Sequence, residues 1–208
     1  MQYSQKVLDH FMKPHNIGTM ENLSVTATEG SPACGDQVTF YLKINDDSHV
    51  IEDISFQSYG CASNIATASI VTDLVKGKTI EEAKDISWKD ATNELDGLPP
   101  VKMHCSVLAV DTLRLAIKKY ELEKGLKEPE PFSKEVIIEE LRSIIYPQAG
   151  EDIITLKMVK YVRLDDDGTV VIDLDIPKFD QNRESVVDEV KEHLEKYPEV
   201  KDIQVTLA

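Results

Sequence analysis

Residues 98–106 read Leu98-Pro-Pro-Val-Lys-Met-His-Cys-Ser106, and the rest of the chain is organised around this stretch. The two adjacent prolines predict an extended segment, and the apolar pattern after them predicts a long helix starting near His104. Cys105 is therefore expected in the first turn of a helix, where the helix dipole and free backbone N–H groups favour a thiolate. The stretch indicates a reactive or metal-binding cysteine.

The chain has two other cysteines, and each lies in a turn of small residues, where the backbone can approach a ligand closely. They occur in Ala33-Cys-Gly-Asp36 and in Tyr59-Gly-Cys-Ala-Ser63. Residues 37–44 and 50–59 alternate between polar and apolar and predict a hairpin. Because Cys34 precedes its first strand and Cys61 follows its second, both thiols are expected at the same end of that hairpin.

Three cysteines in loops beside regular structure suggest one three-thiolate site. A cysteine can also be simply a small buried hydrophobic residue. That interpretation fits poorly here, because all three cysteines lie beside glycine, Asp36, His104 or a helix start. Asp36 and His104 lie within two residues of a cysteine and could complete a four-ligand set. Such a set suits tetrahedral Zn²⁺ or an iron–sulfur cluster. With carboxylate or imidazole as the fourth ligand, the site is expected to be weaker and more exchangeable than a four-cysteine site.

Composition limits the classes of function. The chain has 208 residues, 41% of them hydrophobic, and a formal net charge of −15, which argues against binding to nucleic acid or to an anionic membrane. No apolar run reaches the roughly 20 residues of a membrane helix. The N-terminus predicts a short amphipathic helix rather than a signal peptide. An odd number of cysteines without a disulfide pattern is typical of a reducing, cytoplasmic location.

The remaining pattern predicts two α+β domains. Residues 18–28 are expected to form a polar loop, and helices are predicted at 62–76, from Thr79, at 87–95 and from His104. Residues 121–134 become charged and contain glycine and prolines, so we expect a linker or surface extension with little that could be buried. We place the linker itself at 126–132, between domains at 1–125 and 133–208. The second domain has the order α-β-β-α-β, with its elements at 133–145, 153–164, 169–176, 183–197 and 200–207.

Several other signals are weaker. Gly77-Lys78-Thr79 resembles the end of a P-loop, but Thr72 stands where that motif requires glycine. Asp165-Asp-Asp-Gly168 lacks the first and last ligands of a calcium loop and predicts a hairpin turn. Four histidines outside the cysteine motifs are expected to be isolated in polar surroundings, and solvated rather than ligating: His10, His15, His49 and His193.

Residues 1 to about 125 resemble the IscU/NifU-type iron–sulfur cluster scaffolds. The resemblance rests on four pieces: Ala33-Cys-Gly-Asp36, Tyr59-Gly-Cys-Ala-Ser63, Val75-Lys-Gly-Lys-Thr79 and Leu98-Pro-Pro-Val-Lys-Met-His-Cys-Ser106. It implies an antiparallel sheet with packed helices. A sister group, the zinc-binding SufU type, has an insertion between the second and third cysteines and lacks the histidine. The gap here is 44 residues and His104 is present, so the IscU type is favoured.

The resemblance also implies roles for individual residues. Cys34, Cys61 and Cys105 would hold a transient [2Fe–2S] cluster, Asp36 would keep it labile and His104 would be a supplementary ligand. Cys105 would be the acceptor of persulfide sulfur from a cysteine desulfurase. An Hsp70-type chaperone would bind the segment made of Leu98, Pro99, Pro100, Val101 and Lys102.

Residues 133–208 resemble the small SufT/PaaD-like domain, with the C-terminal domain of NifU-type proteins as the alternative. Both families usually place a cysteine between the second strand and the second helix, where this chain has Pro177-Lys-Phe-Asp180. Because no cysteine follows Cys105, we expect this domain to recruit partners rather than to bind a cluster.

The sequence thus predicts a non-enzymatic scaffold that assembles [2Fe–2S] clusters and passes them to acceptor proteins. The alternative is a zinc-dependent sulfurtransferase that accepts persulfide sulfur without building a cluster, with Zn²⁺ bound in the purified protein. A structural zinc module that docks partners is a third, weaker interpretation.

Overall fold

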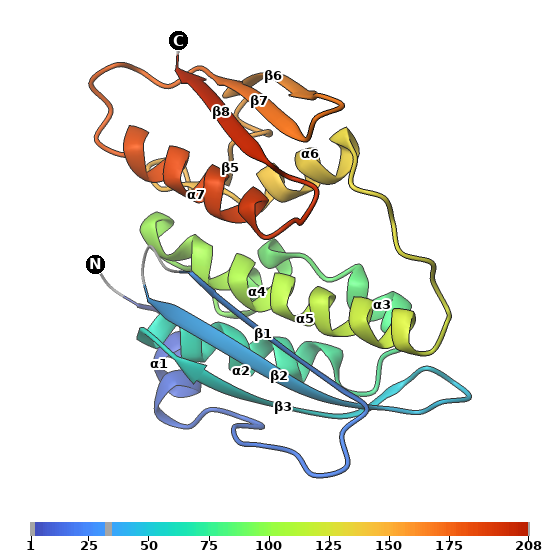
Figure 1. Cartoon of the computed structure of the whole chain (residues 1–208). Coiled ribbons are helices and arrows are strands. Elements are labelled where there is room, and N and C mark those ends of the chain that lie inside the picture. Colours follow the sequence, from blue (N-terminus) through green and yellow to red (C-terminus); the bar gives the residue numbers. More distant parts are fainter. Residues whose placement is uncertain (1–2, 32–34, 208) are drawn as a thin grey trace. The chain divides into compact units, whose positions relative to one another are not determined.

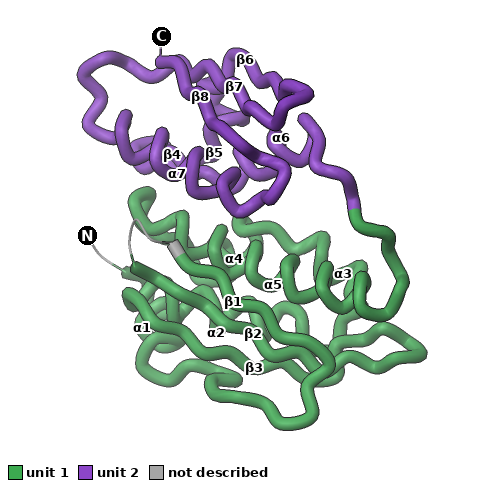
Figure 2. The backbone as a smooth tube through the Cα atoms, viewed as in Figure 1, with its two compact units in different colours: residues 1–129 green, residues 130–208 purple. Residues whose placement is uncertain are grey.

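The computed structural model describes residues 3–31 and 35–207, and only the backbone of Ser31. The chain divides into two units, residues 1–129 and 130–208 (Figure 2). Each unit combines sheet and helices, so the predicted α+β class is confirmed (Figure 1). No helix in the described part of the chain is both long and apolar enough to cross a membrane.

The first unit is built on a three-stranded antiparallel sheet in the order β1-β2-β3. The strands are β1 (Val25–Ser31), β2 (Asp36–Ile44) and β3 (Ile51–Tyr59). Alternate residues of β2 are buried, because the period of two directs one face of the strand into the core. In the register of β2 and β3, Gln37 is paired with Tyr59. The end of β3 and the start of β2 therefore lie side by side.

The helices of this unit pack on the apolar face of the sheet or on one another. They are α1 (Gln5–Met12), α2 (Ala62–Val75), α3 (Ile80–Lys84), α4 (Trp88–Glu94) and α5 (Met103–Glu123), with a 3-10 turn η1 (Pro100–Lys102) before α5. Thr79 and Ser87 start α3 and α4 with capping boxes. The helices α2 and α5 pack against each other and against the sheet (Figure 1). Their N-terminal ends meet, because Thr67 of α2 donates a hydrogen bond to the Cys105 carbonyl at 3.2 Å.

Two predictions for this unit are wrong. The expected polar loop at 18–28 contains most of β1, whose Val25 and Ala27 are buried while its polar side chains face outward. The charged stretch that begins at Glu121 is still helical up to Glu123. Glu121 is buried at the end of α5 because Lys84 pairs with it at 2.7 Å.

The second unit contains helices α6 (Lys134–Arg142) and α7 (Arg183–Glu195), which pack on a sheet of β6 (Val159–Leu164), β7 (Thr169–Leu174) and β8 (Asp202–Leu207). The order is β6-β7-β8, with β6 antiparallel and β8 parallel to β7. A two-stranded ribbon of β4 (Ile145–Tyr146) and β5 (Glu151–Asp152) precedes this sheet.

The predicted α-β-β-α-β order is present, but its second element is shorter. Residues 153–157 form turns rather than strand, because Asp152 accepts hydrogen bonds from the backbone and side chain of Thr155 at 2.7 and 2.5 Å. The predicted helix to residue 145 ends at Arg142 and gives way to β4. The turn predicted at Asp165–Gly168 is present.

Candidate metal and cluster site

Four predicted ligands of the first unit meet where the β2–β3 hairpin adjoins two helix starts. Asp36 is the first residue of β2, and Cys61 is the N-cap of α2. The turn η1 leads directly into α5, which carries His104 and Cys105 in its first turn. Free backbone N–H groups at both helix starts favour negative charge, so the arrangement suits thiolates.

The distances between these residues are short. The sulfur atoms of Cys61 and Cys105 are 3.7 Å apart. Asp36 Oδ2 lies 3.7 Å from Cys61 Sγ and 3.6 Å from Cys105 Sγ, while Asp36 Oδ1 accepts the Cys61 backbone N–H at 3.1 Å. One carboxylate therefore contacts both sulfurs and orients the turn that carries one of them.

Gly60 and Asn64 also fix the turn that carries Cys61. A Cβ atom at Gly60 would lie 2.4 Å from Asp36 Oδ1, so a side chain there would displace the carboxylate. The amide nitrogen of Asn64 donates to Ser58 Oγ at 3.0 Å and to the Gln37 carbonyl at 3.2 Å. Gly60 and Asn64 thus tie the start of α2 to both strand ends; the sequence indicated a small-residue turn at Gly60 but no role for Asn64.

The thiols of Cys61 and Cys105 differ in acidity. Mainly because it accepts a hydrogen bond from Cys105, Cys61 has its pKa lowered to about 5, although burial and Asp36 oppose this. The hydrogen bond to Cys61 and burial raise the pKa of Cys105. Burial of Cys105 beside a second sulfur therefore opposes the thiolate that the helix start favours, and Cys61 is the more acidic of the two thiols.

His104 presents a free ring nitrogen to the same group. Its Nε2 lies 4.0 Å from Asp36 Oδ2, and it is buried without a hydrogen-bond partner among the described residues. The ring also makes a hydrogen bond with the Val101 backbone, and burial lowers its pKa, so the imidazole is neutral. Buried polar atoms are normally hydrogen-bonded, and a ligating histidine often donates its other N–H to a carbonyl. His104 therefore has the properties of a metal ligand.

Asp36, Cys61, His104 and Cys105 are brought together as the sequence predicts. Cys34 lies outside the described residues. In the predicted chaperone segment, Leu98 is buried in the core, whereas Pro100 and Val101 are exposed. Leu98 is therefore unavailable to a partner, and any docking contact is limited to residues 99–102.

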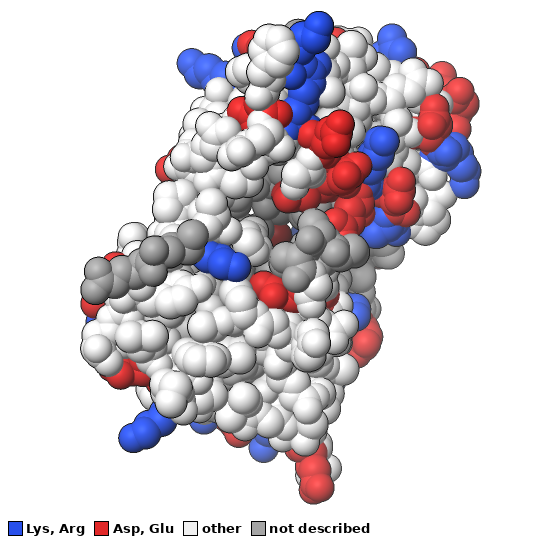
Figure 3. Space-filling model, turned by 90° about the vertical axis from the view of Figure 1, so that its left-hand side faces the viewer, with Lys and Arg blue, Asp and Glu red and all other residues white. Residues whose placement is uncertain are grey.

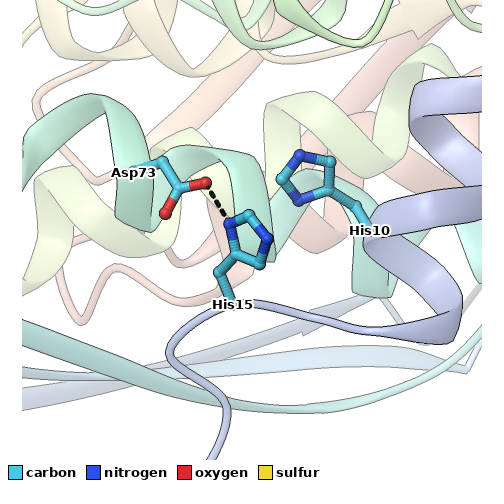
Figure 4. A group of neighbouring side chains, drawn as sticks. All are labelled: His10, His15 and Asp73. Atoms are coloured by element: carbon cyan, nitrogen blue, oxygen red, sulfur yellow. Dashed lines mark hydrogen bonds and ion pairs between the residues drawn. The ribbon is translucent and has the colours of Figure 1, made fainter.

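A second group of possible ligands has no counterpart in the sequence motifs. His10, His15 and Asp73 lie together on the first unit (Figure 4). The expectation that His10 and His15 are isolated is wrong, because the packing of α1 on α2 brings residues more than 50 positions apart into contact. No local pattern in the sequence indicates this contact.

Comparison with known protein families covers both units. Residues 2–127 match the NifU-like N terminal domain family. The chain belongs to this family. Residues 134–207, beyond the NifU-like unit, match the iron–sulfur cluster assembly protein family. The resemblance of the whole chain to iron–sulfur assembly proteins is confirmed.

Named relatives of the NifU-like unit are described as iron–sulfur cluster assembly scaffold proteins IscU. The Aquifex aeolicus protein is 46% identical over 124 residues, covering 60% of this chain and 79% of that protein. One from Archaeoglobus fulgidus is 50% identical over 123 residues, covering 59% and 79%. The Escherichia coli K12 protein is 45% identical over 130 residues, covering 61% of this chain and all of the relative.

Proposed function

We propose that this chain is a scaffold on which [2Fe–2S] clusters are assembled from iron and desulfurase-derived sulfur, before transfer to acceptor proteins. The observation that carries the proposal is the contact of Asp36 with both Cys61 and Cys105, beside the unpaired Nε2 of His104. Cys34 is the third proposed thiolate. The cluster is cargo, so a site that binds and releases it is required.

The donor set supports release. Thiolates are the ligands that iron–sulfur clusters prefer, whereas a carboxylate is a hard ligand poorly matched to a thiolate-bound iron. Asp36 therefore offers a weak point at which an incoming thiol of an acceptor protein can displace a ligand. His104 can hold the iron that Asp36 gives up, because its free nitrogen lies beside that carboxylate.

Sulfur transfer to Cys105 begins in this proposal with the loss of its proton. Once a desulfurase exposes the buried Cys105, its proton passes to solvent, and the resulting Cys105 thiolate attacks the outer sulfur of a desulfurase persulfide. A new S–S bond forms at Cys105 while the bond in the desulfurase persulfide breaks and its cysteine leaves as thiolate. An external two-electron reductant then converts the transferred sulfur to sulfide. Since Cys105 is fully buried, the desulfurase must open the site to reach it.

A zinc-dependent sulfurtransferase is the second candidate, and the same donor set supports it. Two thiolates, a carboxylate and a neutral imidazole suit tetrahedral Zn²⁺ as well as iron. The two candidates share the sulfur-accepting step and differ in the fate of the sulfur. A scaffold needs ferrous iron and a reductant, whereas a sulfurtransferase passes sulfane sulfur on with zinc retained.

Anaerobic reconstitution tests the proposal. The full chain with ferrous iron and sulfide should develop the visible absorption of a [2Fe–2S] cluster, with two irons bound per cluster. Cys34→Ser, Cys61→Ser and Cys105→Ser should each reduce the yield strongly, and His104→Ala should retain part of it. Cluster formation at wild-type yield in any of the three cysteine variants would remove the basis of the three-thiolate site. A zinc-loaded chain that accepts sulfur but builds no cluster would establish the sulfurtransferase.

A further inference from the structure

His10, His15 and Asp73 come from three different segments of the first unit. His10 lies on α1, His15 on the turn after it, and Asp73 near the end of α2 (Figure 4). The His15 Nδ1–H donates to Asp73 Oδ2 at 2.7 Å, and the two imidazole rings are 4.7 Å apart between centroids. One ligand atom from each of the three residues lies within 4.8 Å of the other two.

Hydrogen bonds to α2 already hold this group in place. The buried Ser69 hydroxyl accepts the His15 backbone N–H at 2.8 Å and contacts His10 Nδ1 at 2.8 Å. Asn16 donates to Thr72 at 2.9 Å and to the second oxygen of Asp73 at 3.2 Å. The backbone that carries both histidines is therefore fixed before any ligand binds, which lowers the entropic cost of forming a site.

We propose that His10, His15 and Asp73 form a second metal site, which binds a divalent first-row transition metal ion such as Zn²⁺ through nitrogen and oxygen. Imidazole and carboxylate are the ligands that such borderline ions accept without thiolate. The ion takes the place of the proton that His15 Nδ1 and Asp73 Oδ2 share at 2.7 Å, so that both atoms become ligands beside one ring nitrogen of His10. A tetrahedral ion with bonds of about 2.1 Å needs ligand atoms about 3.4 Å apart. The side chains of His15 and Asp73 are 57% and 35% exposed, which leaves room for their ligand atoms to adjust to this spacing.

This site is separate from the thiolate site. Cys61 and Asp73 lie on the same helix twelve positions apart, which corresponds to about 18 Å along the axis at 1.5 Å per residue. It also differs in chemistry, because it contains no sulfur. An ion bound here joins α1 and the following turn to α2, so it should stabilise the folded first unit by mass action.

Zinc binding to the full chain with Cys34, Cys61 and Cys105 all replaced by serine isolates the site, since the thiolates are absent. Calorimetric titration should show one equivalent of Zn²⁺ bound. His15→Ala and Asp73→Asn in this background should each weaken binding by about tenfold or more. Asp53→Asn is the matched control, because Asp53 is an exposed carboxylate that pairs with Lys76, and it should leave binding unchanged. No zinc binding, or equal affinity in all four proteins, would overturn the proposal.

If the chain with all three cysteines replaced by serine does not fold, zinc binding is measured instead on the chain that keeps its cysteines. The wild-type chain should bind one more equivalent of Zn²⁺ than Asp73→Asn, and its midpoint of thermal unfolding should rise more with zinc. The ring ¹⁵N resonances of His10 and His15 should shift on the second equivalent in the wild-type chain. Equal stoichiometry and unshifted resonances would exclude the site. This test is independent of the proposed scaffold function, which can fail while zinc still binds here.

Discussion

Asp36 accepts the backbone N–H of Cys61 at 3.1 Å with one carboxylate oxygen and contacts the sulfur of the same residue with the other. The carboxylate thus has two roles, one in shaping the turn before α2 and one as a proposed hard ligand. A substitution that keeps an acceptor oxygen but removes the charge separates these roles.

Asp36→Asn and Asp36→Ala should both give a cluster that lasts longer and transfers more slowly to an acceptor protein, because both remove the hard ligand. Only alanine leaves the Cys61 N–H without its acceptor, which should lower the free energy of unfolding by about 1 kcal/mol relative to asparagine. Cluster lifetime and transfer are measured by visible absorption, and unfolding by urea titration. A cluster in Asp36→Asn that is lost as fast as in the wild type would contradict the ligand role.

Iodoacetamide should modify Cys61 before Cys105 in the metal-free chain carrying Cys34→Ser. With a pKa of about 5, Cys61 stays ionised at pH 6, so its alkylation rate should change little between pH 8 and pH 6. The rate for an ordinary thiol falls about tenfold per pH unit below its pKa of about 8.5. Cys105→Ala removes the hydrogen bond that lowers the pKa of Cys61 and should restore the ordinary pH dependence. Peptide mass spectrometry follows both sites, and faster modification of Cys105 would reverse the assignment.

Replacing Pro99-Pro100 by Ala-Ala should weaken binding of an Hsp70-type partner while leaving cluster assembly on the isolated chain nearly unchanged. Pro100 and Val101 are exposed, so they are available to an extended-peptide groove. Leu98→Ala is the contrasting variant, because Leu98 is buried and its truncation should cost about 2 kcal/mol or more of stability. Fluorescence anisotropy measures partner affinity. Unchanged affinity in Ala-Ala would leave the prolines with only a structural role.

Residues 1–129 alone should assemble the cluster with the spectrum and iron content of the full chain. We place the cut after Pro129, because the Phe132 ring packs 4.7 Å from the Tyr197 ring and belongs to the second unit. Residues 130–208 contain 19 acidic and 10 basic residues, and Figure 3 shows groups of acidic side chains on this unit, the upper one in the view, with basic side chains among them. Such a surface suits electrostatic steering of a basic partner, and the tether raises the local concentration of that partner.

The expected defect of the shortened chain is therefore slower delivery to, or supply from, one specific partner. Stopped-flow measurement of cluster transfer compares the two lengths, with 1 M salt as the control for electrostatic steering. Iron bound by residues 130–208, or failure of residues 1–129 to assemble a cluster, would contradict this division of roles.

The second unit should lose stability in acid through Glu140. Burial alone would raise the pKa of Glu140, but His193, Lys196 and Tyr197 hold it at about 2. Because its pKa is about 4.3 when unfolded, the stabilisation is complete at neutral pH and is lost as the pH falls from about 4.3 towards 2.

Glu140→Gln should lower stability at pH 7 by about 3 kcal/mol and flatten this acid dependence. Glu139→Gln is the matched control, since its side chain is 76% exposed, and it should have little effect. Urea unfolding followed by the NMR signal of Tyr197 measures the second unit. Parallel pH profiles for the wild type and Glu140→Gln would exclude the assignment.

The local patterns predicted most of the elements and four members of the site. The turn glycines, the capping residues Thr79 and Ser87, and the proline pair before α5 act within a few residues, so their effects can be read directly. The hairpin register then follows from alternation, and it brings Asp36 beside Cys61. These inferences needed no knowledge of tertiary packing.

The missed features depend on contacts between distant residues. Strand β1 is an edge strand of Val25-Thr-Ala-Thr-Glu-Gly-Ser31, in which only the buried Val25 and Ala27 mark the inner face. The protonation of Cys105 depends on a sulfur 44 positions away, and the Asp73 partner of His15 lies 58 positions away. Local sequence propensities indicate neither of these contacts.

The direct connection between residues 98–102 and Cys105 has a mechanical consequence. Cys105 follows Lys102 by three residues across η1 and the first turn of α5, whereas Asp36 and Cys61 are held by the hairpin and α2. A protein that pulled on residues 99–102 is therefore expected to shift His104 and Cys105 together, away from Asp36 and Cys61, and to lengthen the 3.7 Å sulfur–sulfur spacing. Displacement of these two ligands by force applied outside the site would lower affinity for the cargo without any competitor entering it.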